Sequence, residues 1–212
     1  MEPGSRGQDT RLETINSLLH GFGILFGLIS MPVLIAHASK DNNFAGIAGS
    51  AIYGFCFLLL FSFSTLYHGF QQPKIKERLK ILDHISIYFL IAGTYTPIIL
   101  IFVNNSFGFT LLAILWGLTV AGIFFKIFFT GRFEIVSVIV YILMGWISFA
   151  GGETFFAAMP PAVIILIITG GALYCIGVIF YLWQKYTYHH AIWHIFVLAA
   201  AICHYVAVLI SV

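Results

Sequence analysis

The 212-residue chain is 60% hydrophobic and only 8% charged, whereas soluble domains carry about 25% charged residues. One soluble core of this length cannot bury so many apolar stretches, so composition excludes an ordinary soluble protein and places the chain in lipid. The formal net charge is +2, which is too small for us to expect a nucleic-acid partner. The length fits a single domain.

Seven stretches of the chain have about the length and apolar character that a helix needs to cross a bilayer. They predict an all-α membrane protein, a seven-transmembrane helix bundle, with a polar N-terminal segment at 1–15 and one membrane domain at 16–212. The N-terminal segment lacks the apolar core of a cleavable signal peptide, so we expect the first span to remain in the mature protein. The predicted spans are 16–38, 44–67, 82–103, 108–129, 134–151, 160–183 and 189–211.

The basic residues predict the orientation of the bundle. Of the ten Lys and Arg residues, Lys40 alone falls on one side of the predicted membrane. Because Lys and Arg concentrate in cytoplasmic segments, the N-terminus is expected inside and the C-terminus outside. The residues on the inner side are Arg6, Arg11, Lys74, Lys76, Arg78, Lys80, Lys126, Arg132 and Lys185.

Polar side chains within membrane spans are energetically costly and mark function by default. In this chain they gather at the ends of four predicted spans, which the predicted topology places at one depth near the cytoplasmic boundary. The four groups are Glu13, Asn16 and His20; Ser64 and His68; Asp83 and His84; and His190 and His194.

These residues are suited to a metal site. His190 and His194 are one helical turn apart and present their imidazoles side by side, as in the helical pair of many zinc proteases. With His68 as a third ligand and one open position, they match the ligand set of a catalytic zinc, which activates water. Asp83 can balance the charge of the ion and accept a hydrogen bond from that water. Ser64, one turn before His68, can hold the same water or a substrate oxygen.

Other candidate residues have a structural interpretation. A lone histidine in a membrane helix usually forms an interhelical hydrogen bond, and this is how we interpret His20, His84 and His204. His204 lies ten residues beyond His194, or about 15 Å along a helix, so it cannot share the same ion. We interpret the three cysteines as small buried hydrophobic residues: Cys56, Cys175 and Cys203.

Four motifs, in order along nearly the whole chain, resemble those of a hemolysin III-type member of the progestin and adipoQ receptor family. That family includes the adiponectin receptors, and the resemblance implies seven helices, an internal N-terminus and a zinc ion. The implied zinc ligands are His68, His190 and His194, with Ser64 and Asp83 as companions. The motifs are ETINSLLH (13–20), STLYH (64–68), DHISI (83–87) and HAIWHIFVLAAAICHY (190–205).

The same constellation is similar to that of the alkaline ceramidases, which implies hydrolysis of lipid amides. Because the chain lacks the long extramembrane N-terminal region of the animal receptors, the resemblance favours a bacterial-type protein over a hormone receptor. We therefore expect a multi-pass protein of the bacterial plasma membrane, with membrane lipids as its partners. The sequence leaves the oligomeric state open.

Two functions from different classes remain open. In the first, the protein is a zinc-dependent intramembrane hydrolase of lipid amides or esters, with Asp83 as general base and Ser64 as donor to the developing oxyanion. In the second, it is a non-enzymatic membrane effector with structural zinc, either a pore-forming cytolysin or a regulator of membrane lipid state. The outer halves of the predicted helices are almost wholly apolar, which counts against a water-filled channel in the monomer.

Overall fold

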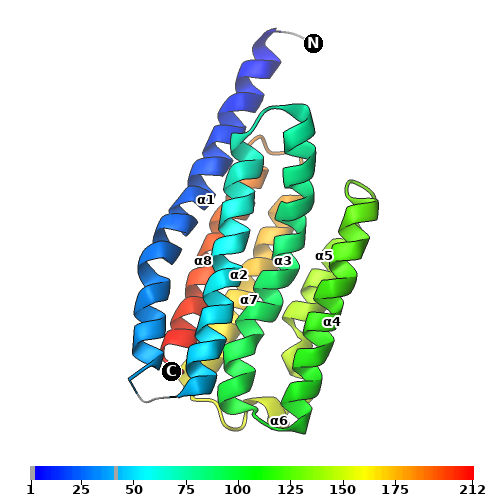
Figure 1. The fold of residues 1–212 in the computed structure, drawn as a ribbon. Helices are drawn as coiled ribbons and strands as arrows, with labels where there is room; N and C mark the ends of the chain where they lie inside the picture. The colour runs from blue at the N-terminus through cyan, green and yellow to red at the C-terminus, as the bar shows by residue number, and fades with distance from the viewer. Residues whose placement is uncertain (1–2, 41–42) are drawn as a thin grey trace.

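The computed structural model describes residues 3–40 and 43–212, and it describes side-chain surroundings from Thr10 onward. Residues 1–2 of the predicted N-terminal segment and the side chains of 3–9 lie outside that description. Helices dominate the described chain, and no strand occurs in it (Figure 1). The helices are α1 (Pro3–Ala38), α2 (Phe44–Gly69), α3 (Pro73–Phe102), α4 (Ser106–Phe129), α5 (Glu134–Gly145), the 3-10 helix η1 (Ile147–Gly151), α6 (Glu153–Phe156), α7 (Pro161–Leu182) and α8 (His189–Leu209).

Six of these helices are long and apolar enough to cross a membrane, namely α1, α2, α3, α4, α7 and α8. The prediction of an all-helical membrane protein is therefore confirmed. The fifth predicted span, 134–151, is divided between the 12-residue α5 and the short η1. Its backbone leaves α-helical geometry at Trp146, so α5 alone is shorter than the other six helices.

Local sequence explains where several helices begin. Asn43 precedes α2, and its side chain accepts a hydrogen bond from the Gly46 backbone N–H at 3.1 Å. Asn105 caps α4 in the same way through the Gly108 N–H at 3.0 Å. These side chains satisfy N–H groups that have no partner within the helix. α3 and α7 instead begin with a proline, whose missing N–H costs nothing at that position.

Helix packing is closest around α2, which packs extensively against α1 and α3, while α7 packs against α8. Tyr53 and Phe57 of α2 and Tyr88 of α3 are among the largest fully buried side chains. Small residues allow these helices to approach. A Cβ atom added at Gly23 of α1, for example, would overlap the Phe61 ring of α2.

Tyrosine hydroxyls link helices across the interior. Tyr53 of α2 donates to the Ala201 carbonyl of α8 at 3.2 Å, and Tyr205 of α8 donates to the Ser30 carbonyl of α1 at 3.2 Å. Tyr95 of α3 donates to the Gly145 carbonyl at the end of α5. Such bonds satisfy the polar end of a large apolar side chain where no water is available.

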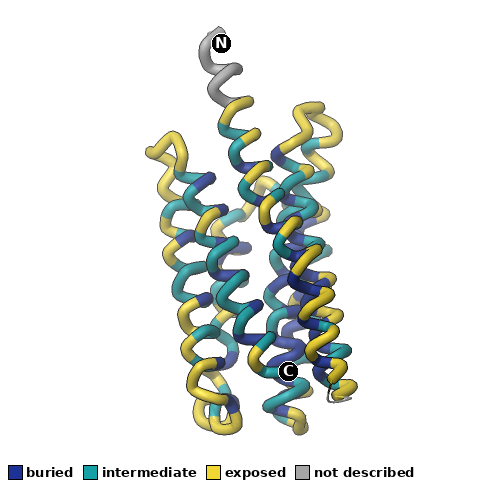
Figure 2. The backbone as a smooth tube through the Cα atoms, turned by 90° about the vertical axis from the view of Figure 1, so that its left-hand side faces the viewer, coloured by how far each residue is buried: buried dark blue, intermediate teal, exposed yellow. Residues whose placement is uncertain are grey.

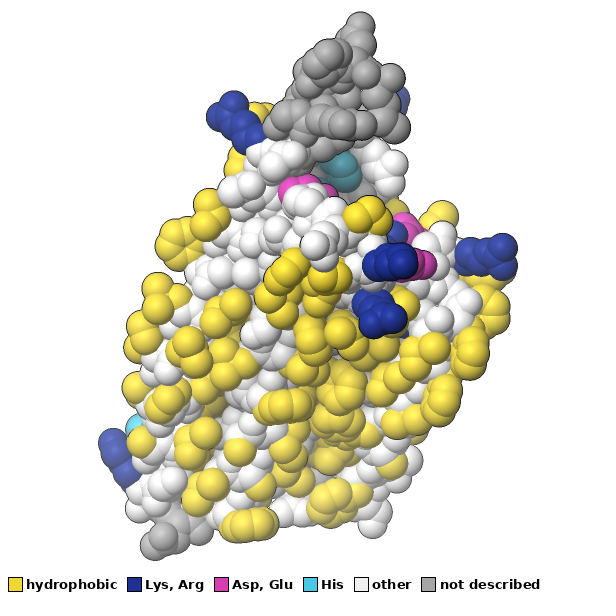
Figure 3. Space-filling model, turned by 45° about the horizontal axis from the view of Figure 1, so that its top comes forward, with side chains coloured by type: hydrophobic (Ala, Val, Ile, Leu, Met, Phe, Trp, Pro, Cys, Tyr) yellow, Lys and Arg dark blue, Asp and Glu magenta, His cyan; other side chains and the backbone are white. Residues whose placement is uncertain are grey.

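The outer surface is suited to lipid. Exposed positions follow the outward sides of the helices, and buried positions face the interior (Figure 2). Most of the Lys, Arg, Asp and Glu side chains in view gather at one end, and the sides are mainly hydrophobic (Figure 3). The same end contains the C-terminus of α2 and the N-termini of α3 and α8 (Figure 1).

Candidate metal centre

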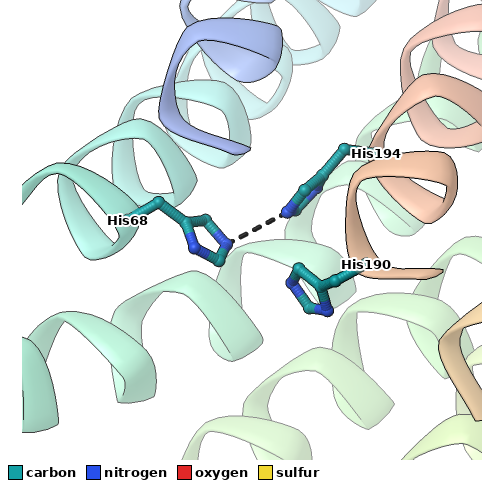
Figure 4. Close-up of side chains that lie close together, drawn as sticks. All are labelled: His68, His190 and His194. Atoms are coloured by element: carbon teal, nitrogen blue, oxygen red, sulfur yellow. Dashed lines mark hydrogen bonds between the residues drawn. The ribbon is translucent and has the colours of Figure 1, made fainter. Parts of the chain in front are cut away.

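Three histidines from two helices meet at the charged end of the bundle. His68 lies in the last turn of α2, and His190 and His194 lie in the first turns of α8 (Figure 4). The Nε2 atoms of His68 and His194 are 3.0 Å apart, and each residue offers a ligand atom within 4.8 Å of the others. His68 and His194 are buried, and His190 is half-buried.

This group can hold a metal ion. Two ligand nitrogens on a tetrahedral zinc lie about 3.3 Å apart when each Zn–N bond is about 2.0–2.1 Å. The 3.0 Å separation of the His68 and His194 nitrogens is close to that value. The buried Nδ1 of His194 has no hydrogen-bond partner among the described residues. Three imidazoles with ligand atoms this close together are the donor set of a zinc site, and their spacing fits a metal ion.

Glu13 of α1 orients the His68 ring, a role that sequence reasoning missed. The Glu13 Oε2 atom lies 2.8 Å from His68 Nδ1 and 2.8 Å from Lys76 Nζ. A carboxylate on Nδ1 places a proton there and leaves the Nε2 lone pair directed at the cluster. The spacing of Glu13, Asn16 and His20 indicated a shared polar face on α1, but it did not indicate which of them would reach His68.

Asp83 and Ser64 both line a cavity that begins at the histidines. The Asp83 carboxylate interacts electrostatically with His68 and the Ser64 hydroxyl. The buried Ser64 Oγ has no partner with full hydrogen-bond geometry among the described residues. The two side chains are therefore close neighbours beside the histidines.

The remaining histidines are in different environments. The His20 ring packs against His194 with centroids 3.9 Å apart, and neither of its nitrogens has a partner among the described residues. His204 Nε2 lies 3.2 Å from the Ile167 carbonyl of α7, which agrees with the interhelical role expected for it. His84 lines the cavity but does not belong to the three-histidine group.

The cluster lies between two cavities of different character. A cavity of about 160 Å³ extends from His190 and His194 along the bundle interior and has mostly apolar walls. A second, polar cavity of about 390 Å³ adjoins Glu13, His68 and His190 at the charged end. Through these two openings, the cluster is accessible to an apolar ligand from one side and to water from the other.

The half of the interior that lies away from the histidine cluster contains more polar groups than the sequence indicated. Tyr95, Ser148 and Tyr174 line the inner cavity well away from the histidine cluster. Tyr95 and Ser148 bond to each other at 3.1 Å, whereas the Tyr174 hydroxyl has no partner among the described residues. The helix halves away from the cluster are therefore less apolar inside than expected, because the hydroxyl groups of two tyrosines and a serine face the interior.

Comparison with known proteins defines the class. Residues 9–205 match the family described as "Haemolysin-III related", so the chain belongs to that family. It is 41% identical over 205 residues to Hemolysin-3 of Bacillus cereus, covering 97% of this chain and 94% of the relative. It is 42% identical over 197 residues to the Hemolysin-3 homolog of Bacillus subtilis strain 168, covering 93% and 92%.

A more distant similarity extends to animals. The chain is 25% identical over 209 residues to the human monocyte to macrophage differentiation factor, covering 91% of this chain and 81% of the relative. The resemblance inferred from the four motifs is thus confirmed at the level of the hemolysin III family.

Proposed function

We propose that this protein is a zinc-dependent intramembrane hydrolase of lipid amides or esters. The observation that carries this proposal is the three-histidine cluster, which borders an apolar cavity through His190 and His194. Asp83 and Ser64 line the same cavity. An acyl chain in that cavity would bring its carbonyl group to the cluster, and the polar cavity on the other side would supply water.

Each residue has a distinct role in this proposal. His68, His190 and His194 bind the ion, which supplies Lewis acidity when bound. Asp83 accepts the proton of the attacking water. Ser64 donates a hydrogen bond to the oxygen on which negative charge develops.

The test is turnover of a panel of ceramides, acyl amides and phospholipids by purified, zinc-loaded protein in nanodiscs. Released fatty acid is measured by mass spectrometry with and without chelator. Asp83→Asn should keep most of the zinc and lower the rate by about 10²–10⁴-fold, because it removes the base. Ser64→Ala should have a smaller effect, equivalent to about 0.5–1.5 kcal/mol for one neutral hydrogen bond.

Ser50→Ala is the matched control, because Ser50 is also a fully buried serine of α2 without a described partner but does not line the cavity. It should leave turnover unchanged. Absence of turnover by zinc-loaded wild type across the panel would contradict the hydrolase function.

A second candidate is a non-enzymatic effector, either a cytolysin or a regulator of membrane lipid state with structural zinc. The observation that favours it is the name Hemolysin-3 carried by relatives more than 40% identical to this chain. Lysis of erythrocytes or lipid vesicles by wild type and by Asp83→Asn to the same extent, without lipid turnover, would support this function.

For topology, the proposal is seven crossings by one domain at 16–212 in the bacterial plasma membrane, with the N-terminus inside. α5 and η1 together are about 28 Å long, from about 18 Å of α-helix and about 10 Å of 3-10 helix, which approaches the thickness of the hydrocarbon core. The start of α1 and the end of α8 lie at opposite ends of the bundle (Figure 1), as an odd number of crossings requires.

Cysteine labelling tests this orientation in a background in which the three native cysteines are replaced. An impermeant reagent applied to intact cells should label Val212→Cys and leave Lys74→Cys unlabelled until the membrane is permeabilised. The reverse pattern would contradict the orientation.

A further inference from the structure

Lys126 is a buried cation within the membrane domain. It lies in the last turn of α4, and only 1% of its surface is exposed. Its ammonium forms no ion pair with a described carboxylate. Glu134, the acidic group that acts on Lys126, instead pairs with the half-exposed Lys80 at 3.2 Å. A cation held inside a membrane protein without a close ion pair is by default a candidate functional group, and Lys126 lines the inner cavity.

Two further polar groups face the same cavity as Lys126. Ser137 of α5 is 1% exposed and lines the cavity, where the Tyr88 hydroxyl of α3 lies beside its Oγ without forming a hydrogen bond of good geometry. His84 of α3 lines the cavity, and its Nδ1 is likewise without a described partner. The Tyr141 hydroxyl of α5 holds this segment in place by donating to the His84 carbonyl at 2.9 Å. Three helices thus each contribute one polar residue to the lining of the same cavity: Lys126 of α4, Ser137 of α5 and His84 of α3.

The chemistry of this group selects its ligand. An ammonium excludes a metal cation, and each of the three side chains can donate a hydrogen bond, so an anion satisfies all of them. The adjoining cavity walls are apolar and include Ile87, Ile91 and Val138. The ligand must therefore combine an anionic group with a hydrocarbon chain.

We propose that Lys126, His84 and Ser137 form a binding site for the anionic headgroup of a lipid, a carboxylate or a phosphate, whose hydrocarbon chain occupies the inner cavity. This site is separate from the three-histidine cluster, and it does not depend on whether the protein catalyses hydrolysis. It would give the cavity a preference for anionic over neutral lipids of the same chain length.

The experiment measures binding of single-chain lipids to protein in phosphatidylcholine nanodiscs, first with chelator so that no bound metal contributes. The probes are palmitate, palmitoyl lysophosphatidic acid and the neutral monopalmitoylglycerol. Wild type should bind at least one anionic probe about tenfold or more tightly than the neutral one, as expected for a charge-assisted hydrogen bond. The preferred anionic probe distinguishes a carboxylate from a phosphate ligand.

Lys126→Met should remove this preference and leave the affinity for the neutral lipid unchanged, whereas Lys126→Arg should retain most of it. Ser137→Ala should reduce the preference to a smaller degree. Lys74→Met is the matched control, because Lys74 is an exposed lysine at the same end of the bundle, and it should behave as wild type. Equal affinity of wild type for the anionic and neutral probes would contradict the proposed site. So would an equal loss of affinity for both kinds of probe in Lys126→Met.

Discussion

The two sides of the bundle differ in how closely they are packed. α2 packs extensively on α1 and α3, and α3 has buried residues from Ile85 to Ile99. α5, by contrast, makes limited contact with α3 and α7. The cavity lies between α5 and the closely packed helices. The proposed metal ligands are therefore on the closely packed side, while the α5 wall of the cavity is on the loosely packed side.

This difference suits a site that needs both precision and access. Metal ligands must be held within a few tenths of an ångström, which closely packed helices can achieve. Elements that open to admit a ligand come from the least stable parts of a protein. We infer that changes on the α1–α2–α8 side affect metal binding and stability, whereas changes on the α5 side affect lipid binding.

The largest expected effect comes from removing a ligand on the closely packed side. His68→Ala, His190→Ala and His194→Ala should each reduce zinc to well below one ion per chain, because two imidazoles hold zinc poorly. Metal analysis of the purified variants measures this. His204→Ala is the control, since His204 bonds to Ile167 and is not part of the cluster. Equal zinc loss in His204→Ala would contradict the ligand assignment.

A smaller effect is expected from the carboxylate behind His68. Glu13→Ala removes the acceptor for His68 Nδ1 and should weaken zinc binding by about 10–100-fold, as is typical for partners of metal-ligating histidines. Glu13→Gln keeps an acceptor oxygen without the charge and should fall between this variant and wild type. Competition with a chelating dye gives the affinities.

Glu153→Gln is the control for charge alone, because Glu153 is an exposed acidic residue in the short α6. It should bind zinc as wild type does. Unchanged zinc affinity in Glu13→Ala would show that His68 is oriented by helix packing rather than by the carboxylate.

The sequence predicted the site where periodicity and topology together constrained it. His190 and His194 are on one helix, so their proximity followed from the helical repeat, and His68 followed from the common depth of the helix ends. The contact between Glu13 and His68 was not predictable in this way, because it depends on the rotation of α1 about its axis. Lys126 was assigned only to the cytoplasmic side, since the sequence does not show that α3 and α5 enclose its side chain.

The fold, like the site, was predictable from the sequence only in part. Length and hydropathy located six helices because each is a long apolar run. The fifth predicted span was less well defined, since 134–151 contains the change from α-helix to 3-10 helix near Trp146. The close approaches of α1 to α2 at Gly23 and of α2 to α3 at Gly49 depend on how each helix is rotated about its axis, which only the structure reveals.

The smallest expected effect compares one glycine on each side of the bundle. A Cβ atom at Gly49 of α2 would lie 2.6 Å from the Pro97 Cα of α3, a backbone atom that cannot move without separating the helices. Gly49→Ala should therefore destabilise the metal-free protein by about 1–3 kcal/mol, the usual effect of overpacking. At Gly117 of α4 an added Cβ meets nothing within 4 Å, so Gly117→Ala should be neutral or stabilise by up to about 1 kcal/mol through helix propensity. The free energies of unfolding of both variants are measured in the same detergent. Equal stability of the two variants would mean that α2 and α3 are not the closely packed pair on which the metal site depends.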